Sequence, residues 1–357
     1  MSNGVSALLT DVGTVELRQY PLPKVDERGV LVRVTTATLC GTDVHIWSGR
    51  KRPGRFPLPL GHEGCGEVVA AGEQARDVLG MPIRPGDRIV WNYVWYCGSC
   101  SSCLLSDHAE LTCREGFRYG IAIPPAAEPS FFGTLGSHIY LRPGTGIVKL
   151  PKDLEDDSLV APVNCAMATV MEIGRVAGDL RGKSVLIQGS GQVGLYAAAA
   201  CKTWGAASVT CVDVVPERLT LARKFGADRT VDPNSEGVGS LSGMDVAIEL
   251  TGNPEVVQWG LDSLSVGGTY ILGGTVYLQA ISNIDVGTIV MKRITVRGSV
   301  LAGHRSLLSA VRFLQRTRDE FPYDSCLGEA FTLENIDAAF ELAASHQIAG
   351  RVSVRSQ

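Results

Sequence analysis

Residues 184–194 read SVLIQGSGQVG, and this stretch decides the fold of the second half of the chain. A short apolar run ends at Gln188 and is followed by Gly189, Gly191 and Gly194, which form the pattern G-x-G-x-x-G. In a dinucleotide-binding turn these glycines permit a tight turn, let the backbone approach a pyrophosphate, and let helix and strand pack closely. Because the pattern follows a strand-like run and opens a helical stretch, it predicts a dinucleotide site; the alternative is a glycine-rich turn that binds nothing.

The coenzyme predicted for this site is NAD. The next apolar run, SVTCVD, ends at Asp213, close to the spacing of about 20 residues at which an acidic side chain accepts hydrogen bonds from the adenosine ribose. A carboxylate at that position would also repel the 2′-phosphate of NADP. We therefore assign Asp213 to the coenzyme, together with Gln192, Val193 and Arg218.

The sequence around this site predicts an α/β protein of two domains. The first ~150 residues are short strand-like runs between glycines and prolines, which indicates a mostly β region. From about Asp179, apolar runs alternate with helical stretches, and this alternation predicts a parallel sheet covered by helices on both faces. After Gly303 we expect two amphipathic helices and a closing strand, RVSV. A length of 357 residues also favours two domains.

Composition excludes several classes of protein. Hydrophobic residues make up 45% of the chain and charged residues 20%, which is far from a disordered composition. The net charge of −4 gives no overall basic surface for nucleic acid, and the predicted partner is a small molecule. We see neither a basic start followed by an apolar core nor an apolar run of about 18 residues. We therefore expect no membrane partner and a cytoplasmic location.

Four of the ten cysteines, Cys97, Cys100, Cys103 and Cys113, lie within seventeen residues. Four thiolates on one loop, without an open position, are typical of a tetrahedral structural zinc site. An iron–sulfur cluster and four unrelated thiols are the alternatives. With a cluster, the protein would be an electron carrier. A nucleic-acid-binding role for the loop is disfavoured because it contains no lysine or arginine between its first and last cysteine.

A second set of candidate metal ligands is dispersed: Cys40 in TLCGTDVH, His62 in PLGHEG and Cys165 in APVNCAMATV. Each residue alone could be a core thiol or a satisfied polar group. Two cysteines and one histidine together form a known catalytic zinc ligand set, which leaves a fourth position for water or substrate.

The motifs CGTDVH, GHEGCGEV, CGSCSSC, NCAMAT and GSGQVG, in this order, resemble the medium-chain, zinc-dependent alcohol dehydrogenase family over nearly the whole chain. The resemblance implies a GroES-like, mostly β catalytic domain at residues 1–160 and 301–357. It implies an inserted Rossmann domain, a doubly wound parallel sheet, at residues 161–300. Two zinc ions per chain and a homodimer or homotetramer are also implied. A catalytically silent NAD-binding protein is the competing interpretation, and the three candidate ligands argue against it.

The family carries out NAD-dependent interconversion of an alcohol and its aldehyde or ketone. The metal lowers the pKa of a bound hydroxyl, and hydride passes between the carbinol carbon and nicotinamide. The resemblance implies a proton relay through Thr42 and His45. It places Asp43 where it can orient His62, and Glu63 beside the metal as an alternative ligand.

Two further positions are assigned through the family. Thr169 is expected on the nicotinamide side of the coenzyme. The sequence departs from the family at Gly41, where some members carry a phosphate-binding arginine, and this departure leaves the pyrophosphate to other groups such as Arg351. The last spacing in the four-cysteine group is also longer than is common, which indicates a small loop insertion.

The segment WSGRKRPGRFPLPLG between Cys40 and His62 carries four cations, Arg50, Lys51, Arg52 and Arg55. The family places this segment near the substrate, where guanidinium groups suit phosphonate, phosphate or carboxylate oxygens. A solvated basic loop is the alternative. The strings APVNCAMATVMEIG, AVRFLQ and FPYDS resemble a subgroup associated with phosphonate metabolism, which favours a phosphonate-bearing alcohol or aldehyde. An uncharged polyol or cyclitol is the competing substrate.

Overall fold

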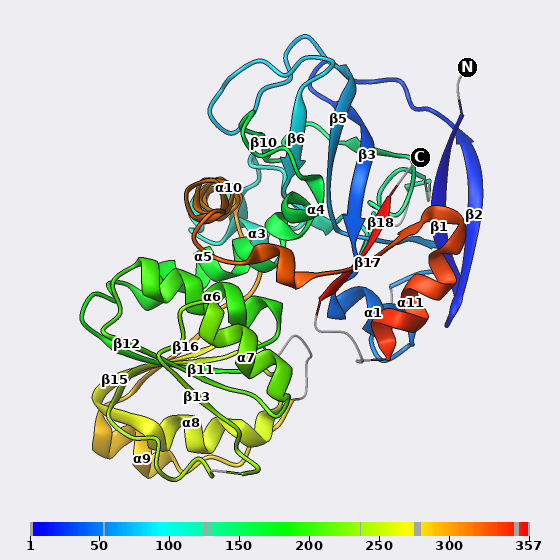
Figure 1. The fold of residues 1–357 in the computed structure, drawn as a ribbon. Coiled ribbons are helices and arrows are strands. Elements are labelled where there is room, and N and C mark those ends of the chain that lie inside the picture. The colour runs from blue at the N-terminus through cyan, green and yellow to red at the C-terminus, as the bar shows by residue number, and fades with distance from the viewer. Residues whose placement is uncertain are drawn as a thin grey trace. The chain divides into compact units, whose positions relative to one another are not determined.

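The computed structural model describes residues 3–52, 54–124, 127–128, 130–235, 237–274, 280–345 and 350–355. The chain forms two compact units (Figure 1). The first unit contains residues 1–168, 301–316 and 326–357, and the second contains residues 169–300 and 317–325.

These units differ from the predicted domain boundaries at two short segments, 161–168 and 317–325. The first segment contains the 3-10 helix η1 (Ala161–Asn164), whose Asn164 side chain donates to the carbonyl oxygens of His62 and Trp91. In the second segment, Phe321 stacks on Phe225 with ring centroids 6.1 Å apart. Side-chain contacts thus place residues 161–168 in the first unit and residues 317–325 in the second, whereas the sequence predicted the opposite for both segments.

The first unit is mostly β structure, with a sheet in the strand order β10-β6-β5-β3-β18-β17 and β9 paired to β3. The strands are β3 (Val30–Thr38), β5 (Glu63–Ala71), β6 (Arg88–Trp91), β9 (His138–Leu141), β10 (Ile147–Lys149), β17 (Leu327–Thr332) and β18 (Arg351–Arg355). Smaller sheets contain β1 (Asn3–Asp11), β2 (Thr14–Pro21) and β4 (Leu58–Pro59), and β7 (Val94–Trp95) with β8 (Phe117–Arg118). Strand β18 lies between β3 and β17, so residues 351–355 join the sheet that β3 begins.

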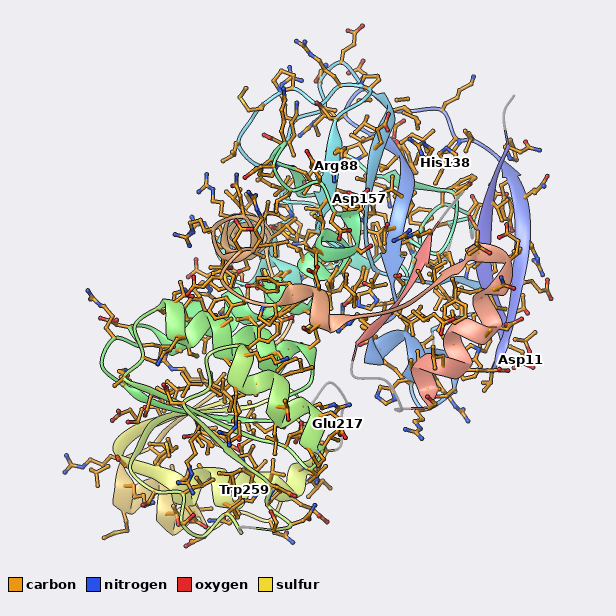
Figure 2. The ribbon with its side chains drawn as sticks, in the orientation of Figure 1. Asp11, Arg88, His138, Asp157, Glu217 and Trp259 are labelled. Atoms are coloured by element: carbon orange, nitrogen blue, oxygen red, sulfur yellow. The ribbon has the colours of Figure 1, made fainter. Side chains whose placement is uncertain are left out.

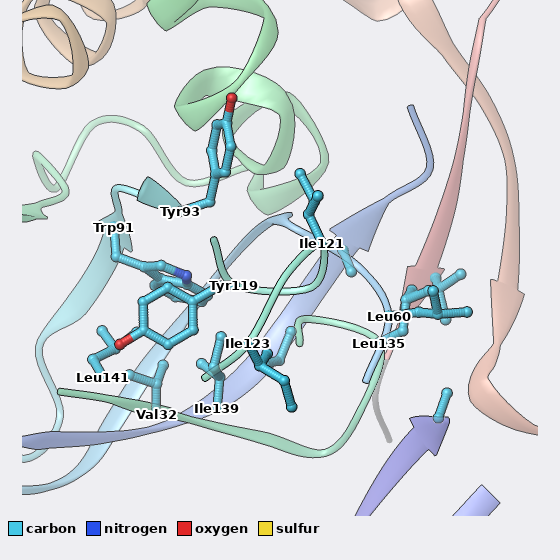
Figure 3. Close-up of a cluster of buried hydrophobic side chains, with 14 of the residues drawn as sticks. Val32, Leu60, Trp91, Tyr93, Tyr119, Ile121, Ile123, Leu135, Ile139 and Leu141 are labelled. Carbon is cyan, nitrogen blue, oxygen red and sulfur yellow. The ribbon is translucent and has the colours of Figure 1, made fainter. Parts of the chain in front are cut away.

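The core of the first unit is formed by alternating strand residues and by aromatic side chains (Figure 3). Trp91 and Tyr119 are fully buried, and Tyr119 retains hydrogen bonds through its hydroxyl, which lies 3.0 Å from Thr145 Oγ1. Burial of each large apolar side chain contributes roughly 1.5–3 kcal/mol. This packing fixes the strands that carry the candidate ligands.

The first unit also contains several helices. They are α1 (Gly41–Trp47), α2 (Ser101–Leu105), α3 (Ala109–Thr112), α4 (Asp157–Val160), α10 (His304–Thr317) and α11 (Ile336–Ala344). Trp47 of α1 stacks on Phe340 of α11, with ring centroids 5.5 Å apart. Arg88 of β6 forms an ion pair with Asp157 of α4, and Figure 2 shows the two labelled side chains close together. These contacts join α1 and α4 to the rest of the unit.

The second unit contains a six-stranded, all-parallel sheet in the order β13-β12-β11-β14-β15-β16. The strands are β11 (Ser184–Gln188), β12 (Ser208–Val212), β13 (Arg229–Val231), β14 (Met244–Glu249), β15 (Leu264–Leu272) and β16 (Thr295–Gly298). Its helices include α6 (Gln192–Thr203), α7 (Pro216–Lys224), α8 (Val257–Ser263) and α9 (Val286–Lys292). Figure 1 shows α6 and α7 on one face of the sheet and α8 and α9 on the other.

The strand order, counted from β11 as the first strand, is 3-2-1-4-5-6, the order of a Rossmann fold. The prediction of an α/β protein with a doubly wound parallel sheet is therefore confirmed. In such sheets, ligands bind beyond the carboxyl ends of the strands where the order reverses, here between β11 and β14.

In the part of the chain that the structure describes, no single helix is long and apolar enough to cross a membrane. One bent pair of helices, Asp157–Asn164 with Ala166–Ala177, passes the same test of length and composition when its two parts are taken together.

Candidate metal centres and coenzyme site

Cys40 is held at the N-terminus of α1 by one hydrogen bond to its side chain and one from its backbone. The Thr42 backbone N–H donates to Cys40 Sγ at 3.2 Å, and the Cys40 N–H donates to Asp43 Oδ2 at 2.9 Å. An acidic residue in the first turn and a thiol at the cap both suit the positive end of a helix. The local sequence C-G-T-D therefore fixes the direction of the Cys40 thiol.

His62 lies beside this thiol at the end of the segment that leads into β5. Its Nε2 is 3.2 Å from Cys40 Sγ, and its Nδ1 is 3.0 Å from Asp43 Oδ1. Both His62 and Asp43 are buried. A carboxylate on Nδ1 leaves Nε2 facing the thiol, which is the arrangement that orients a metal-binding histidine.

Cys165 completes the set. The ligand atoms of Cys40, His62, Glu63 and Cys165 all lie within 4.8 Å of one another. Burial by itself raises the pKa of Cys40, but a hydrogen bond from Cys165 and the charge of His62 lower it well below its usual range. Cysteine binds metal as the thiolate, so this shift favours ligation.

A zinc ion fits these donors. Zinc–sulfur bonds of ~2.3 Å and zinc–nitrogen bonds of ~2.0 Å place sulfur and nitrogen about 3.5 Å apart in a tetrahedron, close to the 3.2 Å between Cys40 and His62. Two thiolates and one imidazole also form the ligand chemistry of a catalytic site with an open fourth position.

Glu63 stands beside the set and is fully buried. One carboxylate oxygen accepts from Thr38 Oγ1 at 2.6 Å, and the other is paired with the Arg351 guanidinium. Burial raises the pKa of Glu63 to about 7, although the positive charge of Arg351 opposes this rise. The charge of Glu63 therefore depends on Arg351, which lies 288 positions away in the chain.

The four-cysteine group is a separate cluster around α2 and α3. Its Sγ atoms are 3.5 Å apart for Cys100 and Cys103, 3.7 Å for Cys97 and Cys113, and 3.9 Å for Cys97 and Cys103. Tetrahedral zinc with bonds of ~2.3 Å requires sulfur atoms about 3.8 Å apart, whereas a disulfide requires ~2.05 Å. Backbone N–H groups of Ser99 and Cys100 lower the pKa of Cys97 to about 6. The four thiols therefore fit a closed metal site.

The glycine turn between β11 and α6 has the geometry that its sequence predicts. Gly189 has a φ of +98°, and a Cβ atom on Gly194 would lie 1.9 Å from the Gly189 carbonyl oxygen. Only glycine fits either position. A Cβ atom on Gly191, which caps α6, would meet nothing within 4 Å. The open space beside Gly191, in front of the helix N-terminus that begins at Gln192 and Val193, suits a phosphate group.

Asp213 follows β12 and contacts the same turn. Its Oδ2 accepts from the Ser190 backbone N–H at 2.7 Å, and its Oδ1 accepts from Val215 N–H at 3.0 Å. Arg218 Nη1 of α7 lies 3.9 Å from Asp213 Oδ2. The carboxylate is thus held at the carboxyl end of the sheet, beside the turn.

The other predicted residues lie as follows. Thr42 and His45 are three positions apart on α1 and half-buried, so they share a helix face. Thr169 is half-buried in α5 (Ala166–Ala177). The predicted coenzyme ligand Arg351 is bound to Glu63 in the first unit.

The basic loop is not uniform. Arg50 and Arg52 are exposed, whereas Arg55 donates to the carbonyl oxygens of Pro124 and Ala127 at 3.4 and 3.1 Å. Arg55 therefore supports the backbone of another segment. Lys51 differs from both: it is half-buried, and no hydrogen bond of its side chain to a backbone carbonyl is found among the described residues.

Several residues of the site were not singled out by the sequence. Tyr93 packs edge-on against His62 with ring centroids 5.0 Å apart, and Asn164 donates to the His62 carbonyl oxygen at 2.9 Å. Thr38 binds Glu63. No local sequence pattern marks Tyr93 or Thr38 as part of the site. Asn164 directly precedes Cys165, so its position in the sequence could have suggested a role.

Two family models together match most of the chain: "Alcohol dehydrogenase GroES-like domain" at residues 26–152 and "Zinc-binding dehydrogenase" at residues 193–316. A third model, "Glutamate/Leucine/Phenylalanine/Valine dehydrogenase", matches residues 162–216 around the glycine turn. The L-threonine 3-dehydrogenase of Aeromonas hydrophila subsp. hydrophila is 32% identical over 308 residues, which are 82% of each chain. The chain belongs to the medium-chain zinc-dependent alcohol dehydrogenase family. The predicted GroES-like domain is thereby confirmed.

Other members of the family are similar over the full length. The 5-exo-hydroxycamphor dehydrogenase of Pseudomonas putida is 27% identical, with 94% of each chain covered. The solved structure of an alcohol dehydrogenase from Thermotoga maritima has a TM-score of 0.92 at 27% identity, with both chains fully covered. A putative zinc-binding dehydrogenase from Sinorhizobium meliloti 1021, solved with NADP bound, has a TM-score of 0.86 at 26% identity and covers 99% of this chain and 100% of its own.

Proposed function

We propose that this zinc-containing dehydrogenase uses NAD to interconvert an anionic alcohol with its aldehyde or ketone. The observation that carries the proposal is the donor set of buried Cys40 and His62 with half-buried Cys165, which fits zinc and leaves a fourth position for a substrate oxygen. The four-cysteine group would hold a second zinc ion that stabilises its loop.

In the proposed reaction, the alcohol loses a proton from oxygen and a hydride from carbon. Zinc, when bound, acts as a Lewis acid that lowers the pKa of the substrate hydroxyl. Thr42 and His45 would carry the released proton toward solvent along one face of α1. The coenzyme held at the glycine turn would supply the hydride acceptor, the oxidised nicotinamide of NAD. Asp43 would keep His62 Nε2 directed at the ligand set, supported by its 3.0 Å contact with Nδ1.

Three measurements test the activity as a whole: NADH absorbance with a panel of alcohols, zinc counted per chain, and the visible spectrum. We expect NADH formation, two zinc ions and a colourless protein. A brown protein with thiolate-to-iron absorption would favour the electron-carrier interpretation. NADH binding without turnover of any alcohol would favour a silent coenzyme-binding protein.

The choice of NAD rests on Asp213, and it gives the first prediction. We expect Asp213→Asn to weaken NADH binding about tenfold, because a hydrogen bond to a charged group contributes roughly 1.5–3 kcal/mol. The same change should bring NADPH affinity closer to NADH affinity, since it removes the charge that repels a 2′-phosphate. Fluorescence titration of both reduced coenzymes measures these affinities.

Asp228→Asn is the matched control. Asp228 accepts from the backbone N–H of Val209 at 2.8 Å and binds Lys202 at the amino end of β12, so it anchors the same sheet without contacting the glycine turn. It should leave both affinities unchanged. Tighter binding of NADPH than NADH by the unaltered protein would contradict the assignment of Asp213.

The finer identity of the substrate is also a proposal. L-threonine, the substrate named for one relative, carries a carboxylate, whereas 5-exo-hydroxycamphor, named for another, is uncharged. We favour an anionic alcohol, with a phosphonate-bearing one first, because the loop between the candidate ligands Cys40 and His62 is rich in cations. A polyol or cyclitol is the alternative, and matched charged and uncharged alcohols in the panel separate the two.

Assembly and location are proposals of the same kind. We propose a cytoplasmic homodimer or homotetramer that requires neither nucleic acid nor membrane, in keeping with the net charge of −4. Light scattering coupled to size-exclusion chromatography measures the number of subunits.

A further inference from the structure

Two half-buried cations, Lys51 and Arg118, have no role in the reaction proposed above. Lys51 belongs to the loop that follows α1, and Arg118 ends β8. Among the residues that the structure describes, neither side chain has an ion pair or a side-chain hydrogen bond. Burial of a charge without a partner is costly, so cations in such places need an explanation.

Lys51 is placed by the helix that Cys40 begins. Its backbone N–H donates to the His45 carbonyl oxygen at 2.8 Å, so the chain remains against the end of α1. The neighbouring cations Arg50 and Arg52 are exposed. Of these three cations, only Lys51 is partly buried.

Arg118 is placed by a turn that packs on the segment before His62. Its N–H and C=O exchange two hydrogen bonds with Ala122, at 2.8 and 2.9 Å. Within this turn Gly120 has a φ of +68°, and a Cβ atom there would lie 1.8 Å from the Gly61 carbonyl oxygen. The strand that carries Arg118 is thus pressed against the backbone that precedes a candidate zinc ligand.

Tyr93 contacts both the residue after Arg118 and the candidate ligand His62. The Tyr119 N–H donates to the Tyr93 carbonyl oxygen at 2.9 Å, next to Arg118 in the sequence, and the Tyr93 ring packs on His62. In Figure 3 the Tyr93 hydroxyl points away from the labelled core residues. The backbone of Lys51 is therefore tied to the helix that Cys40 begins, and the turn after Arg118 packs on the segment that precedes His62.

The charge of Arg118 acts on Lys51. Burial lowers the pKa of Lys51, and the positive charge of Arg118 lowers it further, while the charges of Cys40 and Asp43 act in the opposite direction. Neither side chain has an ion-pair partner among the described residues, and an external anion would stabilise two like charges of this kind.

We propose that Lys51 and Arg118 bind an oxyanion group, a carboxylate or a phosphonate, on the same small molecule whose hydroxyl or carbonyl reacts at the ligand set. This proposal rests on the proposed function and changes the residues assigned to the substrate. The planar guanidinium of Arg118 can bind two oxygens side by side, and the Lys51 ammonium adds a point charge. The exposed Arg50 and Arg52 and the carbonyl-bound Arg55 would then not contact the anion.

The test uses the zinc-loaded protein with NADH bound and measures binding by calorimetry, so that it does not depend on turnover. The probes are 3-hydroxybutyrate, 2-hydroxypropylphosphonate and the uncharged 1,3-butanediol. We expect both anions to bind at least about tenfold more tightly than the diol. Lys51→Met and Arg118→Met, which keep most of each side chain's apolar stem, should each weaken anion binding at least about tenfold and leave the diol unchanged.

Arg50→Met is the matched control in the same loop and should change nothing. Preference for the carboxylate or the phosphonate identifies the anion. Equal binding of the anions and the diol by the unaltered protein, or equal losses in Arg50→Met, would overturn the proposal. Melting temperature and zinc content verify that each variant is folded.

Failure of the underlying activity would look different. If the proposed function is wrong, no alcohol of the panel, charged or uncharged, reduces NAD, whatever the calorimetry shows. If only the anion site is wrong, alcohols are oxidised but Lys51→Met and Arg118→Met keep the unaltered KM for anionic substrates. If both proposals hold, these variants raise KM for the anionic alcohols and leave kcat and KM for uncharged ones unchanged.

Discussion

We expect the unaltered protein to bind two zinc ions per chain and Cys40→Ala to bind one, and we expect Cys40→Ala to lose at least about a thousandfold in kcat/KM. A catalytic zinc lowers the pKa of bound water from 15.7 to ~7, a difference of roughly 9 units or about 12 kcal/mol, and a bound alcohol should benefit comparably. Removal of a thiolate from a set of three protein ligands should therefore remove most of the catalysis. Elemental analysis and steady-state kinetics on one preparation measure both effects.

The structure adds a reason for choosing Cys40. Its Sγ accepts the Thr42 N–H and lies 3.2 Å from His62 Nε2, so alanine removes a helix cap as well as a ligand. A lost cap costs about 1 kcal/mol, which is too little to unfold the protein or to explain a thousandfold loss. Melting temperature should therefore fall only slightly.

Cys201→Ala is the control for loss of a buried thiol. Cys201 is buried in α6, where burial raises its pKa to about 12, and it belongs to neither cysteine cluster. This variant should keep both zinc ions and full turnover. The mechanism is refuted if Cys40→Ala keeps substantial turnover with metal bound only by the four-cysteine group.

The parts of the molecule that were predictable from sequence are those set by local patterns. The glycine turn is an example, because Gly189 has a positive φ and the close approach of Gly194 to the Gly189 carbonyl leaves no room for a Cβ atom. The α/β class was predictable from the alternation of strand-like and helix-like stretches after about Asp179. Cys40 and Asp43 are three residues apart, so their contact at the start of α1 is also local.

The contacts that sequence reasoning missed depend on strand register. The role of Arg351 at the pyrophosphate stays a prediction, but its pairing with Glu63 was not foreseen: β18 pairs with β3, and Ser353 stands opposite Thr38, which stands opposite Glu63. This register brings the first residue of β18 to the Glu63 carboxylate. Likewise, the four cations of the basic loop look alike in the sequence. Their burial differs only in the folded chain, where Lys51 is half-buried and its neighbours Arg50 and Arg52 are exposed.

The four-cysteine group should control stability rather than catalysis. We expect Cys100→Ser to lose the second zinc ion and to lower the melting temperature by about 10 °C or more. Structural zinc contributes folding free energy directly, and loss of several kcal/mol in a unit of this size corresponds to such a shift, at roughly 2–4 °C per kcal/mol. Turnover measured well below the melting temperature should remain, because Cys40, His62 and Cys165 are unchanged.

Ser101→Ala is the control within the same loop, since Ser101 is exposed at the first position of α2 and offers no metal ligand. It should keep two zinc ions and an unaltered melting temperature. The Sγ separations of 3.5 to 3.9 Å among these cysteines require a central ion or protonated thiols, because four uncompensated thiolates would repel one another. If Cys100→Ser melts at the same temperature as Ser101→Ala, the thiols are protonated and the loop needs no metal.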